Sequence, residues 1–82
     1  MKQEEVFAKV VEILTPYVKN KAALATVAPE TNILKDLEVN SARLVDIVLG
    51  MEDSFKIEVA DDEADGVVTV GDAVKLVLQK AG

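Results

Sequence analysis

The chain has 82 residues, half of them hydrophobic, and its 9 basic and 15 acidic residues give a net charge of −6, with no Cys and no His. This length suits one domain over 1–82, and the excess of carboxylates argues against nucleic acid and for basic protein surfaces as partners. The absence of Cys and His excludes disulfides, thiolate metal sites and Ser-His or Cys-His catalysis, so we expect a protein that carries chemistry and is not itself an enzyme.

The first predicted element is a helix from Gln3 to about Val18. Apolar residues recur there at helical spacing, at Val6, Val10, Ile13, Leu14 and Tyr17. Pro16 has no backbone N–H to donate, so we expect it to kink the last turn or to end the regular helix near Thr15.

No segment of the chain has the sequence pattern of a signal peptide or a membrane span. Residues 1–5 are mostly polar, and no later apolar run approaches the roughly 20 residues that span a bilayer. We therefore expect neither a signal peptide nor membrane insertion, and a cytoplasmic location follows as the default.

A long loop is predicted from Lys19 to Val39, where the helical period is lost. Pro29 and the turn-forming residues 30–32 interrupt this stretch. A structureless loop of about 20 residues is unusual in a compact domain. We therefore expect apolar side chains to pin the loop to the core, namely Leu24, Val27, Ile33, Leu34 and Leu37.

A capped turn that carries one serine opens the second predicted helix, from about Ser41 to Ser54. Asn40 is a good N-cap because its side-chain carbonyl accepts a hydrogen bond from a free amide of the first turn. Ser41 is then the first helical residue, and an attached phosphate there would be stabilised by the positive end of the helix dipole. The site therefore suits a phosphoester better than it suits catalysis.

The second helix presents two sets of apolar side chains. A continuous core stripe is predicted at helical spacing, formed by Leu44, Ile47, Val48, Met51 and Phe55. Val45 and Leu49 lie off that stripe and are expected to form a small exposed ridge. Acidic residues accompany the ridge, at Asp46, Glu52 and Asp53. A partner-binding surface and an ordinary solvated face with two exposed apolar residues both fit this pattern.

Two further helical segments are predicted after an extended connector at 55–59. The connector alternates apolar and polar residues, but five residues without a second such run cannot build a sheet. Asp61–Asp65 predicts one short helical turn that Gly66 ends. Thr69, with Asp72 three residues later, predicts the cap of a last helix. The core stripe of that helix is expected to be Val70, Ala73, Val74, Val77 and Leu78.

Residues 61–72 nearly fit the calcium loop of an EF-hand. Carboxylates stand at positions one, three, five and twelve, and Gly66 stands at position six. Position twelve is Asp72, however, which is shorter than the usual Glu, and the connector before the loop lacks a helical period. We therefore favour a solvated acidic turn followed by a Thr-capped helix and expect no metal site, with calcium binding at 61–72 as an alternative.

The chain resembles the acyl carrier proteins from Asp36 to Phe55, and the resemblance extends over nearly its whole length. The family's signature is Leu-Gly-x-Asp-Ser-Leu, a Val/Leu-rich helix ending in Glu-Glu-x-Phe, an Ile-Pro-Asp-type segment and a Thr-Val start to the last helix. The matching residues here are Leu37-Glu38-Val39-Asn40-Ser41-Ala42, Val45-Asp46-Ile47-Val48, Met51-Glu52-Asp53-Ser54-Phe55, Ile57-Glu58-Val59-Ala60-Asp61 and Thr69-Val70-Gly71-Asp72-Ala73-Val74. Their order and spacing together are fairly specific.

The resemblance implies an all-α fold: a small up-and-down bundle of three main helices plus one short helix, with a long loop between the first and second helices. It also implies a 4′-phosphopantetheine attached to Ser41 as a phosphodiester by a phosphopantetheinyl transferase, with Asn40 and Ala42 flanking the attachment site. The arm would supply the thiol that this sequence lacks. It would carry acyl groups as thioesters between enzymes of a fatty-acid, lipid or polyketide-type pathway, with the acyl chain sheltered between helices.

Partner enzymes of this family present basic patches to the second helix, so the resemblance also implies a docking surface. The acidic contacts would be Glu38, Asp46, Glu52 and Asp53, and the apolar contacts Val45 and Leu49. We expect the carrier itself to be a monomer. An acidic helical docking module that is never modified is the alternative function.

Three residues around Ser41 depart from the family's pattern. Asn40 replaces Asp, which keeps the cap but removes a charge, and Ala42 replaces Leu, which shortens an apolar contact. Arg43 places a positive charge where the second helix is usually acidic. Together these departures predict a specialised carrier with its own transferase, acyl group or partners.

Overall fold

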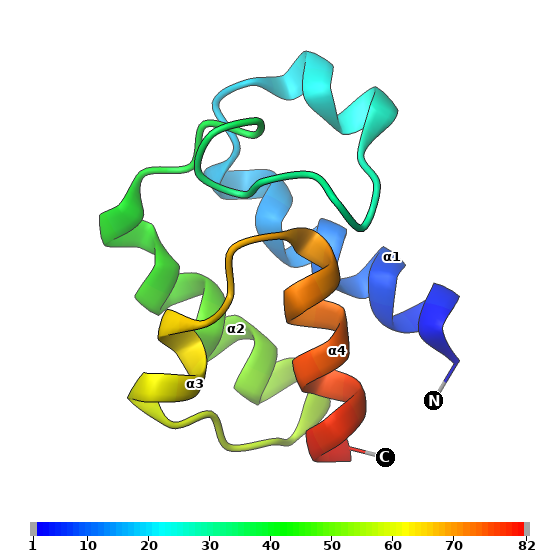
Figure 1. Ribbon diagram of the computed structural model, residues 1–82, viewed down its shortest axis with the longest axis vertical. Coiled ribbons are helices and arrows are strands. Elements are labelled where there is room, and N and C mark those ends of the chain that lie inside the picture. Colours follow the sequence, from blue (N-terminus) through cyan, green and yellow to red (C-terminus); the bar gives the residue numbers. More distant parts are fainter. Residues whose placement is uncertain (1, 82) are drawn as a thin grey trace.

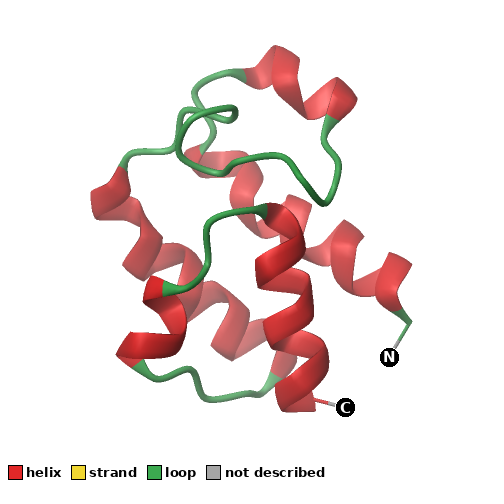
Figure 2. Cartoon of the chain, in the orientation of Figure 1, coloured by secondary structure: helices red, strands yellow, loops and turns green. Residues whose placement is uncertain are grey.

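Three long helices and one short helix form the architecture of the computed structural model, which describes residues 2–81; Met1 and Gly82 lie outside the described residues. The helices are α1 (Gln3–Leu14), α2 (Leu44–Phe55), α3 (Asp61–Asp65) and α4 (Val70–Ala81). Short 3₁₀ segments are η1 (Thr15–Tyr17), η2 (Lys21–Thr26) and η3 (Ser41–Arg43). Figure 1 shows successive helices running up, down, up and down. The predicted all-α bundle is confirmed, and Figure 2 shows helices joined by loops, without a strand in residues 2–81.

The first helix ends where the proline predicts. Its last regular residue is Leu14, and Pro16 lies in the 3₁₀ turn that follows. The Thr15 hydroxyl donates a hydrogen bond of 2.7 Å to the carbonyl of Val11, which satisfies one of the free carbonyls at the helix end. No helix among residues 2–81 has the length and apolar character needed to cross a bilayer.

The hydrophobic core lies where α1 packs against both α2 and α4. Each long helix places one stripe in it, as the spacing predicts. The buried helical residues of this core are Val6, Val10, Leu14, Ile47, Met51, Val70, Ala73, Val74 and Val77. Leu76 of α4 is also buried, although it lies outside the predicted stripe. Complete burial of a Val, Leu, Ile or Met side chain stabilises the fold by about 1.5–3 kcal/mol.

The long loop between α1 and α2 is held in place by both its side chains and its backbone. Ile33 and Leu37 are buried, as predicted, and Leu24 and Val27 pack half-buried against the core. Leu34 does not anchor the loop, because its side chain is 39% exposed. The predicted loop also contains the 3₁₀ segment η2, which the sequence pattern did not indicate.

An isolated antiparallel bridge joins this loop to the start of α4. Asn32 pairs with Thr69, the Ile33 amide donates to the Val68 carbonyl at 3.0 Å, and the Val70 amide donates to the Thr31 carbonyl at 3.0 Å. These bonds fix the loop over the end of the bundle that carries the start of α2.

The segment after α2 is an extended connector, as predicted. Lys56 ends α2 in a left-handed conformation, with φ 56°. The short helix α3 then runs back along α2 and is tied to the end of α4, because the Lys80 ammonium lies 2.7 Å from a carboxylate oxygen of Glu63. This ion pair, together with the Ala60 amide, lowers the pKa of Glu63.

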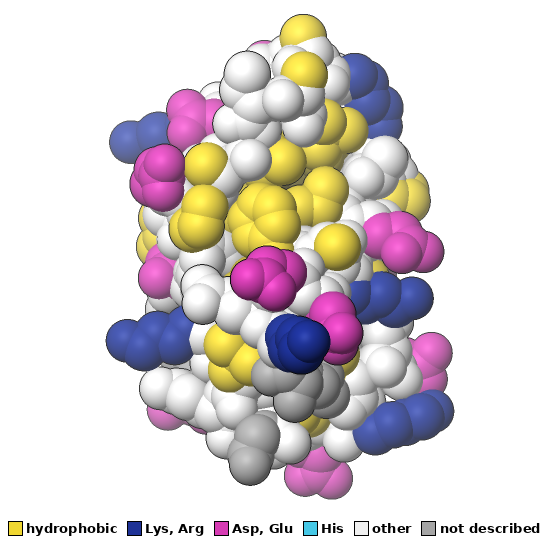
Figure 3. Space-filling view, turned by 90° about the vertical axis from the view of Figure 1, so that its right-hand side faces the viewer, with side chains coloured by type: hydrophobic (Ala, Val, Ile, Leu, Met, Phe, Trp, Pro, Cys, Tyr) yellow, Lys and Arg dark blue, Asp and Glu magenta, His cyan; other side chains and the backbone are white. Residues whose placement is uncertain are grey.

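The surface on the right-hand side of Figure 1 combines hydrophobic side chains with charges of both signs. Figure 3 shows a central group of hydrophobic side chains on that face, with acidic and basic side chains mixed around it. This face is therefore not uniformly acidic, although the chain as a whole has a net charge of −6.

Candidate functional site

The start of the second helical stretch is capped by Asn40, as the sequence predicts. The Asn40 backbone is extended, with φ −65° and ψ 129°, and its side-chain oxygen accepts a hydrogen bond of 2.9 Å from the Ala42 amide. The Arg43 amide donates to the Asn40 carbonyl at 2.8 Å. Ser41 is therefore the first residue of the 3₁₀ turn η3, and its side chain is exposed. The regular helix α2 begins at Leu44, three residues later than predicted.

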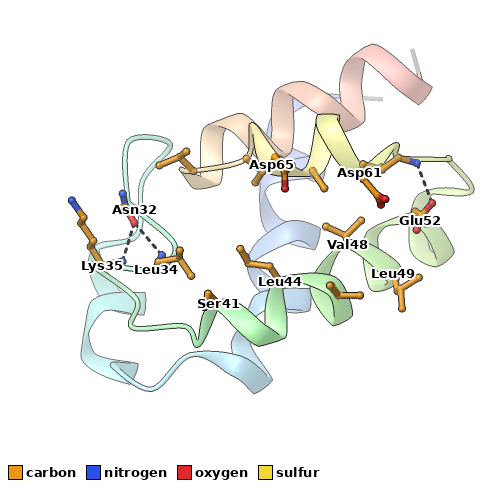
Figure 4. Close-up of a pocket in the computed structure, with 15 residues that line it drawn as sticks. Asn32, Leu34, Lys35, Ser41, Leu44, Val48, Leu49, Glu52, Asp61 and Asp65 are labelled. Atoms are coloured by element: carbon orange, nitrogen blue, oxygen red, sulfur yellow. Dashed lines mark hydrogen bonds between the residues drawn. The ribbon is translucent and has the colours of Figure 1, made fainter.

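Ser41 lies at one end of a cavity of about 740 Å³ between α2, α3 and the long loop. Figure 4 shows the serine at one end and Glu52 and Asp61 at the other, with Leu44 and Val48 between them on α2. The cavity is lined by Asn32, Leu34, Lys35, Ser41, Leu44, Val45, Val48, Leu49, Glu52, Val59, Asp61, Ala64, Asp65, Val67 and Val68. A chain attached to Ser41 therefore has a partly enclosed, mainly apolar groove beside it.

Two residues of the predicted α2 core stripe line this cavity. Ile47 and Met51 are buried in the core, but Leu44 and Val48 are only half-buried and border the open space. The helical spacing places all four on one broad apolar face. This spacing does not say which edge of that face meets α1 and which edge faces α3, so it does not locate the cavity that the family resemblance implies.

Every large hydrophobic side chain that is exposed within residues 2–81 borders the same cavity. The exposed fractions are 65% for Val45, 56% for Leu49, 50% for Val68 and 39% for Leu34. The ridge of Val45 and Leu49 is exposed, as predicted. Leu34 on the long loop and Val68 just before α4 extend this apolar rim beyond α2, which the sequence pattern did not indicate.

The acidic residues near α2 have different surroundings. Glu38 and Asp53 are exposed. Asp46 is paired with Arg43, with 3.2 Å between Oδ2 and Nη1. Glu52 is half-buried, and its Oε2 accepts a hydrogen bond of 3.0 Å from the Val59 amide, so this carboxylate holds the connector against α2.

Glu38 has an unusual backbone conformation just before the serine. Its φ is 56°, the left-handed region that favours glycine, and it occupies the position at which the acyl carrier signature has Gly. The side chain therefore adds a negative charge close to Ser41 despite an unfavourable backbone conformation.

Two of the five carboxylates in the acidic segment 61–72 form contacts within the fold. Glu63 accepts a hydrogen bond from the Ala60 amide and pairs with Lys80. Asp72 accepts from the amides of Val68 and Thr69, each at 3.0 Å, and these bonds lower the pKa of Asp72. Across residues 2–81 no group of three or more Asp or Glu side chains is arranged to hold a metal ion.

Comparisons with known proteins agree with this geometry. No model of a protein family matches the chain. An acyl carrier protein of Prochlorococcus marinus is 37% identical over 82 residues, which is 100% of both chains. An acyl carrier protein of a Picosynechococcus species is 34% identical over 79 residues, covering 96% of this chain and 95% of that protein.

A solved structure of an acyl carrier protein from Enterococcus faecalis has the same fold. It matches 98% of this chain and 99% of its own, with a TM-score of 0.79 and 32% sequence identity. The match covers the whole bundle, including the long loop and the turn that carries Ser41. The predicted family is confirmed, and the chain belongs to the acyl carrier proteins, which are carriers and not enzymes.

Proposed function

We propose that Ser41 carries a 4′-phosphopantetheine arm, joined to its hydroxyl oxygen as a phosphodiester by a separate phosphopantetheinyl transferase. The observation that supports this most directly is the position of Ser41, exposed at a capped helix start and at the end of an apolar cavity. When bound, the arm supplies the thiol that the chain lacks and holds an acyl group as a thioester. The pathway is of the fatty-acid, lipid or polyketide type.

The residues next to Ser41 hold it in a reactive position. The Asn40 side-chain oxygen accepts a hydrogen bond from the Ala42 amide and so stabilises the turn η3, which begins at Ser41. The small side chain of Ala42 leaves the surface beside the serine open to a modifying enzyme. The positive end of the helix dipole stabilises a negative phosphodiester at this position.

The cavity between α2 and α3 shelters the acyl chain. Its volume of about 740 Å³ lies in the range of about 300–1,000 Å³ that is common for small-molecule sites. Leu44 and Val48 form its α2 wall, and Val67 lies on the opposite side. Burial of an acyl chain against these side chains is favourable at roughly 25 cal/mol per Å² of apolar surface removed from water.

Partner enzymes dock on the exposed surface of α2. Val45 and Leu49 provide the apolar contact, and Glu38 and Asp53 are exposed acids that attract basic patches. Asp46 and Glu52 contribute less to the attraction of basic patches. Asp46 is paired with Arg43, and Glu52 accepts a hydrogen bond from the Val59 amide. We further infer that residues 1–82 form one domain that works as a monomer in the cytoplasm.

Mass spectrometry tests the attachment. The purified chain is incubated with coenzyme A and a phosphopantetheinyl transferase of broad specificity, and the mass of the intact protein is measured. We expect the wild type and Ser54→Ala to gain one arm and Ser41→Ala to gain none. Ser54 is the matched control because it is the only other serine in the chain.

Two outcomes would contradict this function. Equal modification of Ser41→Ala would place the arm elsewhere. A wild type that gains no arm, yet binds a basic partner protein with an affinity that Ser41→Ala does not change, would instead support an acidic docking module that is never modified.

A further inference from the structure

The only arginine of the chain lies two residues after the proposed attachment serine. Arg43 is also the only basic residue between Asp36 and Phe55, a stretch that holds five acidic residues. Its Nη1 lies 3.2 Å from Asp46 Oδ2, and the two side chains are 61% and 42% exposed. The pair therefore neutralises the first carboxylate of α2 while leaving more than half of the Arg43 side chain accessible to a partner.

Arg43 also borders a second hollow, separate from the cavity that Ser41 lines. This hollow has a volume of about 520 Å³ and is lined by Pro16, Tyr17, Val18, Lys19, Asn40 and Arg43. Two of these residues are cationic and none is acidic, while Tyr17 and Asn40 add neutral groups that form hydrogen bonds. The lining of this hollow therefore carries positive charge without a carboxylate.

The docking surface carries both signs of charge around the start of α2, where Arg43 lies among Glu38 and Asp46, and only acids among the charged residues of its last turn. Arg43 lies at the start of α2, two residues after the serine, and Lys19 lines the same hollow as Arg43, whereas the acids Glu52 and Asp53 lie in its last turn. A partner enzyme with a uniformly basic surface would meet attraction at the far end of α2 and repulsion from Arg43 beside Ser41. Such a pattern selects among partners because like charges brought together at an interface disfavour the wrong complex.

We propose that Arg43 is a partner-selecting residue, which together with Lys19 receives a carboxylate side chain that a cognate enzyme presents beside the entrance to its active site. A guanidinium suits this role because its planar N–H groups match the two oxygens of a carboxylate. Nη1 is engaged by Asp46, and the remaining N–H groups are available to the partner. This inference rests on the proposed function of Ser41.

The test measures binding and modification separately. The probe is a phosphopantetheinyl transferase whose carrier-facing surface is basic, with coenzyme A as donor. Its Kd for the unmodified carrier and its kcat and KM are compared for the wild type, Arg43→Ala and Arg43→Asp. Lys9→Ala is the matched control, because Lys9 forms a similar exposed i,i+3 pair with Glu12 on α1, at 3.8 Å.

We expect Arg43→Asp to tighten binding to this transferase by about three- to tenfold at low salt, with a smaller gain for Arg43→Ala and none for Lys9→Ala. The gain should shrink as salt is added, because exposed charges are screened. A transferase variant in which the basic residue facing the start of α2 is changed to Glu should show the reverse preference and bind the wild-type carrier more tightly than Arg43→Asp.

Three results would overturn the proposal. One is a Kd that stays within about twofold for both Arg43 variants and both forms of the transferase. Another is an equal effect of Lys9→Ala, which would show a response to net charge alone. The third is a change in the KM for coenzyme A without a change in carrier affinity, which would mean that the hollow contacts phosphate groups of the donor. The mass of the carrier is measured in the same samples and shows whether Ser41 has gained the arm. A failure of the proposed attachment to Ser41 can therefore be distinguished from a failure of the proposed partner selection by Arg43.

Discussion

Thr69 and Asp72 cap the start of α4 reciprocally. The Asp72 amide donates to Thr69 Oγ1 at 3.1 Å, and the Thr69 amide donates to Asp72 Oδ2 at 3.0 Å. The same Oδ2 also accepts from the Val68 amide at 3.0 Å. The Asp72 carboxylate thus fixes both the start of α4 and residues 68–69, which form the bridge to the long loop.

We expect Asp72→Ala to lower the free energy of unfolding by about 1–2 kcal/mol, because the amides of Val68 and Thr69 lose their acceptor and only the Thr69 half of the reciprocal cap remains. Urea unfolding followed by circular dichroism measures the change. Glu58→Ala is the control, since Glu58 is an exposed acid in the connector. Equal stability of the two variants would contradict the capping role.

The same carboxylate predicts how stability depends on pH. Hydrogen bonds from the amides of Thr69 and Val68 lower the pKa of Asp72 from its ordinary value of 3.8, and the ammonium group of Lys80 lowers that of Glu63 from 4.5. The folded chain therefore keeps these charges to lower pH than the unfolded chain does. Their contribution to stability is complete above the ordinary values and is lost as the pH falls through the folded-state pKa values.

We therefore expect the free energy of unfolding to decline as the pH falls below about 4.5. Asp72→Asn should make this decline shallower, because one of the two groups no longer titrates. Urea titrations between about pH 2 and 7 measure both curves. A decline of the same steepness in the variant would exclude Asp72 as a contributor.

Gly71 is required by a close approach between the start of α4 and the long loop. A Cβ at this position would lie 2.8 Å from the carbonyl oxygen of Pro29 and 3.2 Å from its Cβ. The Gly71 amide also donates to that carbonyl at 2.7 Å, so the loop cannot move away without losing the bond. We expect Gly71→Ala to destabilise the fold by about 1–3 kcal/mol.

Gly66→Ala is the matched control for Gly71→Ala. A Cβ at Gly66 would meet only the Glu63 carbonyl oxygen, at 3.5 Å, which is an ordinary contact. Melting curves of the two variants should therefore differ clearly, with Gly66→Ala close to the wild type. Similar melting points would show that the loop adjusts to the added methyl group.

Lys56 offers a route to a more stable protein. It ends α2 with φ 56° and ψ 48°, a conformation that glycine adopts without steric cost. We expect Lys56→Gly to raise the free energy of unfolding by about 0.5–1 kcal/mol. Lys75→Gly inside α4 should instead lower it by about 1 kcal/mol. Urea unfolding compares them, and a loss of stability in both would contradict the conformational explanation.

The sheltering role of the cavity is tested on the loaded carrier. Ala64 lines the cavity from α3, so Ala64→Phe places a ring in the space proposed for the acyl chain. We expect an octanoyl thioester on this variant to hydrolyse faster in mild base than on the wild type, because the acyl group is left in water. Ala8→Phe, at an exposed position of α1, should hydrolyse at the wild-type rate. Identical rates in all three proteins would contradict sheltering.

The sequence by itself determined where the long helices lie and where the capped turn with Ser41 lies, because the signals for both are local. Pro16 ends α1 near Thr15, Asn40 caps the turn at Ser41, and Asp72 caps α4, each through interactions within four residues. The helical period also identified the core stripes. The order and spacing of the family motifs then led to the acyl carrier proteins, which the full-length relatives confirm.

Only the tertiary structure decided which apolar residues bury and which border a cavity. Helical spacing places Leu44 and Ile47 on one face, but the packing of α1 buries Ile47, while α3 stays far enough away to leave Leu44 beside open space. Leu34, expected as an anchor, lies on the rim of that space. The ion pair of Glu63 with Lys80 and the bridge of the long loop to α4 likewise join residues far apart in the chain. Local patterns determine the faces of each helix, whereas the distances between helices depend on how all of them pack together.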